Sequence, residues 1–584
     1  MTDTRNIPTQ AETGLATFTL LVDSQEVGGA LGLDTICVVK KVNKIPAARI
    51  IIFDGSVAHE DFELSSGKMF LPGKEVVIKG GYRSDEAILF KGIIVKHSIE
   101  AKKDKPSRLI IDLKDEAVKM TIGRRSKYFE KISDGEMFEE IIGKYGLTCN
   151  VEATDVIHAE MVQHHVSDWD FIVSRSEVNG KLVLVDNSEV TVKAPDFAQK
   201  PFVKLVYGHN VYEFEAGMDA RDQYTAVKSS SWDMTDQAIV EEAGADPEIT
   251  EQGNCLAADM AGVAGPKELL LQHTGRVTND ELRAWAGAQM MRSRLAKIRG
   301  KVKIQGFSNI SPGDIIELAG FGDRFNGVAF VSSISHRVTS KSIWYTDIEF
   351  GLDKDWFANR YSNIMDLPAA GMVPGVHGLQ VGVVTNIHED PDGEDRIRVR
   401  LPIIDGKSEG VWARMTTLEA GKERGWVFRP EIDDEVVVGF FNDDPRDPVI
   451  LGSMFSSAKP SPVAAEEGNN GKGITTRSGM KLLFDDDKVS VTIQTPKGNS
   501  IIISEKEGAI NVLDENGNKV DLTPDGISLE SAADINIKAS GDINMEGINI
   551  NLKSQAQFKA EGGAGAELSS SGQTVVKGSI VAIN

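Results

Sequence analysis

The feature that most constrains the fold is an eight-residue repeat at the carboxyl end of the chain. From Gly526 onward, apolar residues recur in pairs two positions apart, and successive pairs follow every eight residues, except for a one-residue slip before Ile550. The residues between the pairs are mainly Asp, Asn, Lys, Ser, Gln and Gly. Each octad therefore predicts a strand of about five residues with one polar face, followed by a turn of small residues. The pairs are Ile527 and Leu529, Ile535 and Ile537, Ile543 and Met545, Ile550 and Leu552, Phe558 and Ala560, Ala566 and Leu568, and Thr574 and Val576.

A single octad cannot bury its own apolar edge. One chain could place three octads in each turn of a solenoid, or three chains could each give one strand to every turn. About seven octads would make little more than about two turns of a single-chain helix, whereas solenoids need roughly three stacked repeats or more. An intertwined trimer would instead seal the apolar side chains in a narrow core and leave unpaired strand edges only at its ends. The repeat thus predicts a homotrimeric β-helix or prism, with a core of Ile527, Leu529, Ile535, Ile537, Ile543, Met545, Ile550, Leu552 and Phe558.

The rest of the chain is predicted to be mainly β, with a few helices. Helical periodicity occurs at 134–145, at 167–176 and, over the longest stretch, at 280–298. Residues 376–455 hold five short strands, which suits a small barrel such as an OB-fold. Ser- and Gly-rich residues at 456–479 have little to bury and predict a linker. The predicted domains are an N-terminal tail at 1–16, a region of two β-barrel-like subdomains with helices at 17–370, the barrel at 376–455, the linker, and a needle at 480–584.

Composition argues against several functions. The net charge is −23, so a phosphate backbone is an unlikely partner, because proteins that bind nucleic acid match its charge with Lys and Arg. The predicted barrel is also acidic, so Trp412, Trp426 and Phe428 are interpreted as core residues and not as a stacking platform for bases. No apolar run approaches the roughly 18 residues of a membrane-spanning helix, and no secretory signal peptide is evident at the amino terminus. Three cysteines without C-x-x-C spacing, predicted to be buried thiols, are Cys37, Cys149 and Cys255.

No motif suggests catalysis. The sequence lacks G-x-S-x-G, H-E-x-x-H and the phosphate-binding loop pattern. A group of His158, His164 and His165 near Asp155 and Glu160 has a spacing that fits no zinc motif. Two loops, 390–395 and 514–518, begin like calcium loops but lack the Glu at the twelfth position, so they are predicted to be turns. We therefore expect no enzyme activity, no metal and no cofactor.

The predicted barrel contains an ordered set of segments: Gly382-Val-Val-Thr-Asn386, Arg396-Ile-Arg-Val-Arg-Leu-Pro402, Val411-Trp-Ala-Arg414, 424–438 and 443–453. Further segments lie upstream, such as Ser167-Asp-Trp-Asp-Phe171 and Ser311-Pro-Gly-Asp314, and downstream, such as Lys481-Leu-Leu-Phe-Asp485. The barrel segments resemble the OB domain of baseplate hubs and of VgrG-type spike proteins of contractile injection systems. The upstream and downstream segments resemble the hub and needle of the same family.

The resemblance implies a homotrimer whose hub docks on a hexameric inner tube among baseplate proteins, with the OB domains as a collar and the prism projecting forward. A PAAR-like tip protein would cap the needle, and effectors would be carried in the tube or on the tip. Our candidates for the docking end are the small residues at 560–566 and the final strand, Ser579, Ile580, Val581, Ala582, Ile583 and Asn584. The linker is too short to hold the lysozyme domain that some phage relatives insert there.

The resemblance also implies a location and leaves an alternative. The protein would assemble in the cytoplasm without a signal peptide, then be exported or released with an injection particle and driven into a target envelope. A phage-like receptor-binding fibre or adhesin is the alternative function. The machine could be an anchored type VI system, an extracellular particle or a phage-like tail.

Overall fold

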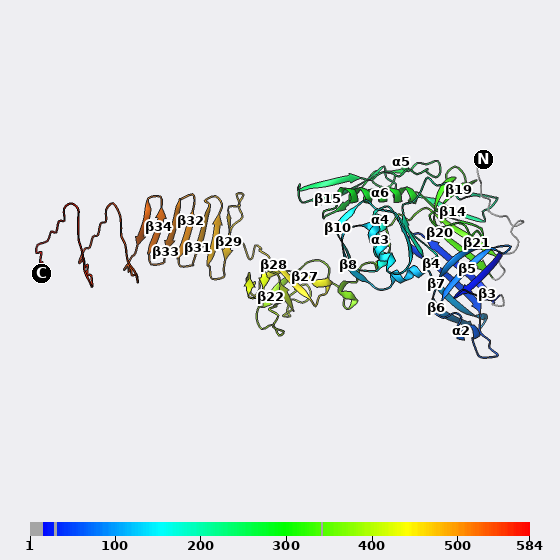
Figure 1. The fold of residues 1–584 in the computed structure, drawn as a ribbon, viewed down its shortest axis with the longest axis horizontal. Helices are drawn as coiled ribbons and strands as arrows, with labels where there is room; N and C mark the ends of the chain where they lie inside the picture. The colour runs from blue at the N-terminus through cyan, green and yellow to red at the C-terminus, as the bar shows by residue number, and fades with distance from the viewer. Residues whose placement is uncertain (1–15, 29–31, 340–342, 584) are drawn as a thin grey trace. The chain divides into compact units, whose positions relative to one another are not determined.

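The computed structural model describes residues 16–28, 32–339 and 343–583. The chain forms two compact units, one of Met1–His377 with Asn442–Pro445 and the other of Gly378–Phe441 with Arg446–Asn584. Figure 1 shows the elements of each unit. The predicted tail at 1–16 lies outside the described residues, apart from Ala16.

A thirteen-stranded sheet forms the frame of the first unit. It is assembled from both ends of residues 17–370, called the hub below, because β20 pairs antiparallel with β3. Two apolar cores lie on it, one around Ile50 and Phe90 and the other around Val302 and Phe350. The predicted barrel-like halves thus share one sheet. Its strands are β1 (Ala16–Val22), β2 (Gln25–Glu26), β3 (Leu33–Lys41), β4 (Lys44–Phe53), β5 (Glu75–Tyr82), β6 (Asp85–Lys102), β7 (Lys105–Lys114), β13 (Val203–Val206), β14 (Glu213–Met218), β18 (Ile298–Gln305), β19 (Ile315–Ala319), β20 (Gly327–Thr339) and β21 (Trp344–Phe350).

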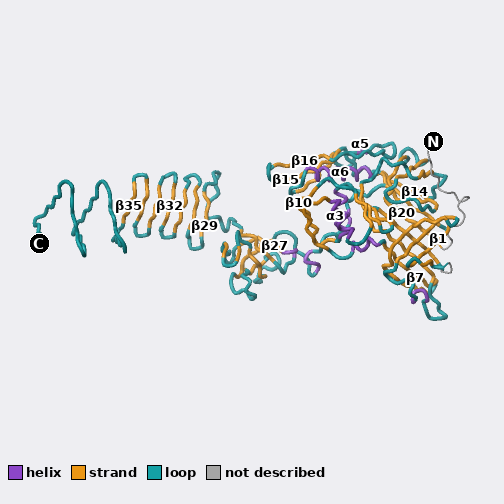
Figure 2. The backbone as a smooth tube through the Cα atoms, viewed as in Figure 1, coloured by secondary structure: helices purple, strands orange, loops and turns teal. Residues whose placement is uncertain are grey.

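Smaller sheets and helices complete this unit (Figure 2). The sheets are β8 (Arg125–Ser133) with β10 (Ile157–Val166); β9 (Thr148–Val151), β11 (Leu182–Asp186) and β12 (Glu189–Lys193); and β15 (Ala226–Asp233), β16 (Ala238–Ala243) and β17 (Glu268–His273). The helices are α2 (Glu63–Ser66), η1 (Glu116–Thr121), α3 (Asp134–Gly143), α4 (Asp168–Val178), α5 (Ala257–Met260), α6 (Asn279–Ala296), α7 (Phe357–Arg360) and η2 (Pro368–Gly371).

The three longer helices begin where their capping residues place them. Ser133 and Glu136 form a reciprocal capping box at the start of α3, and the hydroxyls of Ser167 and Thr278 accept from backbone N–H groups at the starts of α4 and α6. The cap of α3 is therefore Ser133, and Asp134, whose side chain could also cap a helix, is the first residue of the helix. Asp134 is instead fully buried.

The second unit begins with a closed five-stranded barrel, as predicted. It consists of β22 (Gln380–Asn386), β23 (Ile397–Arg400), β24 (Val411–Met415), β28 (Pro448–Ser453) and β27 (Glu435–Phe440), in that spatial order, with β24 and β28 parallel. Val384, Ile397 and Val436 are in its core. The prediction that Trp426 and Phe428 are core residues is wrong. They are 46% and 56% exposed, because they follow the small β25 (Ala420–Gly421) and β26 (Arg424–Gly425) hairpin, which is not part of the barrel.

After the barrel, seven short strands form one antiparallel meander, in which each strand pairs with the next. They are β29 (Gly471–Thr475), β30 (Lys481–Asp485), β31 (Ser490–Gln494), β32 (Ser500–Ser504), β33 (Ala509–Leu513), β34 (Lys519–Thr523) and β35 (Gly526–Glu530). Strand β29 lies within the predicted linker, so strand pairing starts earlier than expected. In this single chain, residues 531–583 contain no helix or strand. Among the described residues, no helix has both the length and the apolar character needed to span a membrane.

Candidate subunit interface on the needle

Two rows of apolar side chains run along one face of the meander. Residues directly opposite each other in an antiparallel pair lie on the same face, as do residues two apart on one strand. The strand register therefore places all twelve side chains on a single face. Row A is Leu482, Ile493, Ile501, Val512, Val520 and Leu529, and row B is Phe484, Val491, Ile503, Ile510, Leu522 and Ile527.

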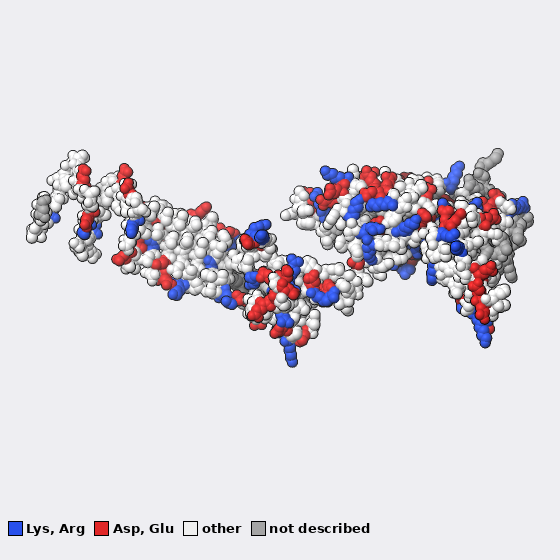
Figure 3. All heavy atoms as spheres, turned by 60° about the horizontal axis from the view of Figure 1, so that its bottom comes forward, with Lys and Arg blue, Asp and Glu red and all other residues white. Residues whose placement is uncertain are grey.

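None of the residues that the structure describes covers this face. Ile493 is 51% exposed, Ile503 is 48% exposed and Ile527 is 78% exposed. Figure 3 shows that much of the surface of the meander is uncharged. A continuous apolar face of this kind on a protein surface marks an interaction site.

The predicted core residues of the octad repeat share this exposure. All nine, from Ile527 to Phe558, are between 49% and 78% exposed in the single chain. Only Ile527 and Leu529 lie in a strand, because strand pairing ends with β35. Of the predicted docking end, Ser579–Ile583 is exposed, and Asn584 lies outside the described residues. That these residues are buried in an assembly of several chains therefore remains a prediction.

Row A lines a groove of about 620 Å³. Ile493, Val512 and Leu529 contribute to it, and so does Ile535, the first large apolar residue beyond the meander. The groove therefore connects the apolar face of the meander to the octad repeat.

Asparagine side chains fix the corners beside this groove. Asn499 Oδ1 accepts from the backbone N–H of Glu515 at 3.0 Å. At the next corner, Asn518 Oδ1 accepts from the hydroxyl of Ser531 at 2.6 Å and from the N–H of Ala532 at 3.1 Å. Asn518 thereby holds the chain where it leaves β35.

The turn preceding β34 is held by a carboxylate, as the sequence predicted for this loop. Asp514 accepts from the backbone and side chain of Asn518 at 2.8 and 2.7 Å. Hydrogen bonds from Asn518, and further ones from Asn516, lower the pKa of Asp514 to about 2 although burial opposes the shift. The loop at 390–395 is built similarly, since the carboxylate of Asp390 accepts from the side chain of Arg396.

Two histidines of the group singled out in the sequence, His158 and His165, make separate contacts with different aspartates. His158 lies 3.0 Å from buried Asp134, which also accepts two 2.8 Å hydrogen bonds from Arg175. Burial would raise the pKa of Asp134, but the hydrogen bonds from Arg175 and His158 hold it well below its usual range. His165 lies 2.8 Å from Asp366, where the chain leaves the hub. Within the described residues, no group of three or more His, Cys, Asp or Glu side chains is placed to hold a metal ion.

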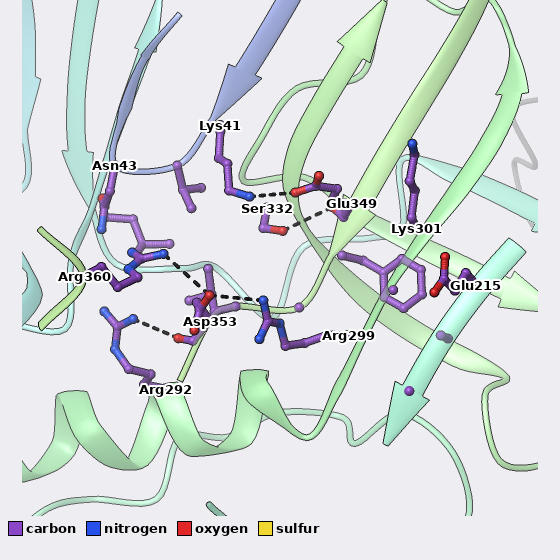
Figure 4. Close-up of a pocket in the computed structure, with 18 of the residues that line it drawn as sticks. Lys41, Asn43, Glu215, Arg292, Arg299, Lys301, Ser332, Glu349, Asp353 and Arg360 are labelled. Carbon is purple, nitrogen blue, oxygen red and sulfur yellow. Dashed lines mark hydrogen bonds and ion pairs between the residues drawn. The ribbon is translucent and has the colours of Figure 1, made fainter. Parts of the chain in front are cut away.

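A hollow of about 490 Å³ in the hub is lined by charged side chains (Figure 4). Lys41 pairs with Glu349 at 2.7 Å, and Asp353 pairs with Arg299 at 3.2 Å. Figure 4 shows these side chains converging from β3, β18, β21 and the segment after it. These ion pairs join separate segments of the chain, so we interpret the hollow as a structural feature of the hub.

The three cysteines form no disulfide and are half-buried.

Sequence reasoning identified part of this face. The strict alternation of apolar residues at Lys488–Gln494 predicts a strand with one buried face, and the structure places β31 there, at Ser490–Gln494. The two rows themselves were not predicted. That alternation indicates one apolar face per strand but does not align the strands.

Comparison with known proteins assigns the class. The family described as the type VI secretion system/phage-baseplate injector OB domain matches residues 380–455, which form the closed barrel. The closed barrel is thus similar to the OB domain of injection machines. It belongs to the family described as the Alg8 N-terminal domain, whose model matches residues 12–340, more than half of the chain.

Solved structures of low identity resemble parts of the chain. A tail protein from Neisseria meningitidis has 11% identity and a TM-score of 0.45, and the match covers 59% of this chain and 98% of that one. A type VI secretion component from E. coli, described as similar to the T4 tail proteins gp27 and gp5, has 12% identity and a TM-score of 0.36, covering 74% and 99%. The Francisella PdpA-VgrG complex has 10% identity and a TM-score of 0.38, covering 88% of each.

Proposed function

We propose that this protein is the homotrimeric spike of a contractile injection machine. The uncovered apolar face of the needle carries the proposal. Twelve side chains of this size at about half exposure leave roughly 1,000 Å² of apolar surface on each chain, comparable to the roughly 800 Å² that one partner buries in a stable interface. Three copies would bury these faces against one another and would let residues 531–583 pair between chains.

The spike role follows from the class of the barrel and the length of the needle. The hub would dock on a hexameric inner tube among baseplate proteins, and the carboxyl end would carry a PAAR-like tip. Contraction would drive the needle through the target membrane and deliver effectors. Such a function is mechanical, so we propose that the protein is not an enzyme. It would assemble in the cytoplasm and leave with the injection particle.

The proposal is tested by the mass of the purified chain in solution, measured by light scattering. We expect about three times the chain mass of 63.4 kDa. Replacing Ile493→Asp would place a charge in the shared core and should reduce the mass, because an unpaired buried carboxylate is strongly unfavourable. The matched control is Gln494→Asp, on the opposite face of the same strand and opposite Lys481. A monomeric wild-type chain, or equal effects of the two variants, would contradict the proposal.

A further inference from the structure

We infer that residues 361–372 form a releasable strap, which opens while the rest of the hub stays folded and thereby lengthens the connection to the barrel. The strap follows α7 and precedes His377–Gly378, where the chain passes from the first compact unit to the second. Its only regular structure is the short turn η2. This inference goes beyond the proposed function and does not depend on how many chains assemble.

Two side chains, called the clasp below, hold the strap closed. They are Arg124, the residue before β8, and His165 on β10. The guanidinium of Arg124 donates to four backbone carbonyls, one on β10 and three in succession on the strap. His165 Nδ1 lies 2.8 Å from Oδ2 of Asp366, the next residue of the strap. The four carbonyls are those of His165, Asn363, Ile364 and Met365, at 2.7, 2.6, 3.0 and 3.1 Å.

The chemistry of the clasp permits release. A guanidinium presents its N–H donors in a fixed fork, so one side chain can hold several carbonyls that belong to no helix or strand. Asn363 and Met365 are exposed, so their carbonyls can bond water once Arg124 moves away. Opening the clasp therefore leaves no buried polar group of these residues unpaired, which is the main cost of breaking hydrogen bonds in a protein.

Few apolar contacts hold the strap in place. Tyr361 and Ile364 pack, partly buried, against one core of the hub. Of the other strap residues only Ala369 is buried, whereas Met365 is 77% exposed and Met372 is 67% exposed. Segments with few buried apolar side chains open locally at a much lower free energy than the core around them.

The end of the strap is a strained turn. Ala369 and Ala370 both have a φ of 51°, in the left-handed region, and Gly371 follows with a φ of 73°. A Cβ atom makes this conformation unfavourable, and residues with a side chain adopt it singly and not in succession. The two alanines therefore store strain that extension of the turn would relieve.

The clasp and the strained turn act in opposite directions. The clasp favours the closed strap and the turn favours the open one, so the two states are close in free energy and a modest change can shift the balance. Each released residue adds up to about 3.3 Å of extended chain to the connection. The connection between hub and barrel can thus lengthen without loss of the hub core.

Hydrogen exchange of the full-length protein, measured by mass spectrometry, tests the clasp. The reporting amides are those of Ala370 and Met372, which bond the carbonyls of Leu367 and Ala369 at 2.9 and 3.0 Å. Arg124→Met removes the fork of donors and should speed exchange in the strap roughly tenfold. The matched control is Arg125→Met at the next position, where the side chain is 59% exposed and lies 3.9 Å from Asp168. This control should leave exchange in the strap unchanged.

The strained turn predicts a change of opposite sign. Ala370→Gly, at an exposed position, supplies a residue that accepts the left-handed conformation. Exchange in the strap should therefore slow by about two- to fivefold. Small-angle X-ray scattering on the same samples measures the longest dimension of the particle, which should increase in Arg124→Met and stay constant in Arg125→Met.

The outcomes decide the inference separately from the proposed function. Equal exchange in the two arginine variants, faster exchange in Ala370→Gly, or a constant longest dimension when the strap is open would each overturn the inference. Exchange in β20 reports whether the hub is folded. If Arg124→Met does not fold, Asp366→Ala removes the contact with His165 and should also speed exchange, and unchanged exchange would overturn the inference. A monomeric wild type would refute the proposed function but not the strap.

Discussion

Acidification should destabilise the hub through one buried histidine. His336 lies on β20 in the thirteen-stranded sheet and is 1% exposed. Its Nδ1 lies 3.0 Å from the hydroxyl of Thr346, and its ring lies 5.8 Å from that of Trp344. Burial, with a further contribution from nearby Lys40, lowers the pKa of His336 from 6.5 to about 3. The folded protein therefore keeps this imidazole neutral.

The sign and size of the effect follow from this pKa. The unfolded chain binds a proton at His336 below about pH 6.5, whereas the folded chain does not until about pH 3, so stability falls as the pH is lowered. Each pH unit within this range costs about 1.4 kcal/mol, or about 2 kcal/mol in total by pH 5. The carboxylates whose pKa values are lowered, such as Asp219 and Asp514, lose their contribution only as the pH falls below their unfolded value of 3.8. Between about pH 6.5 and pH 5 these carboxylates stay ionised, so they do not contribute to the loss of stability that His336 causes there.

Urea unfolding of the full-length protein, followed by circular dichroism at about pH 7 and about pH 5, measures this change. We expect His336→Gln to lose most of the difference between the two pH values, because glutamine has no proton to gain. The control His273→Gln replaces an exposed histidine and should leave the difference intact. Equal pH dependence in the wild type and in His336→Gln would refute the reasoning.

Three further predictions concern stability. Arg175→Met should destabilise the hub by about 3–5 kcal/mol in urea unfolding, because it removes the cation paired with buried Asp134, and Asp134→Asn in the same chain should recover part of the loss. Asn518→Ala should lower the free energy of unfolding by about 1 kcal/mol and speed hydrogen exchange at the amide of Ala532, because that amide loses its hydrogen bond to the Asn518 side chain. Unchanged exchange at Ala532 would count against the role of Asn518 at the corner. Ile397→Ala, at a position 1% exposed in the barrel, should cost about 2–5 kcal/mol in the unfolding of that domain, and a cost below about 1 kcal/mol would show that the barrel tolerates the cavity.

Local features of the fold could be predicted because their signals are contained in short segments. The apolar spacing at 280–298 becomes α6, Asn279–Ala296, and the alternation at 488–494 becomes β31, Ser490–Gln494. The five strands of the barrel were likewise separate apolar runs between turns. The cap of α3 shows the limit, since Ser133 and Asp134 are both good capping residues and only the backbone geometry distinguishes them.

Long-range features could not be predicted in this way. Nothing in the neighbourhood of β3 indicates that it pairs with β20, because strand partners far apart in sequence leave no local pattern. The exposure of Trp426 was missed because an aromatic residue beside barrel strands looks the same in sequence whether it faces the core or solvent. For the needle, alternation predicts an apolar face but not the register that aligns twelve residues into two rows.

The meander gives the needle different strengths in the two directions along its length. Its hydrogen bonds connect each strand to the next, so they lie along the length of the ladder and not across it. A push along the ladder presses each strand against its neighbour and loads all the pairs together. A pull on the carboxyl end loads β35 first, so the strands would separate one pair at a time. The base of the needle is therefore expected to resist compression better than tension, as the proposed piercing role would require.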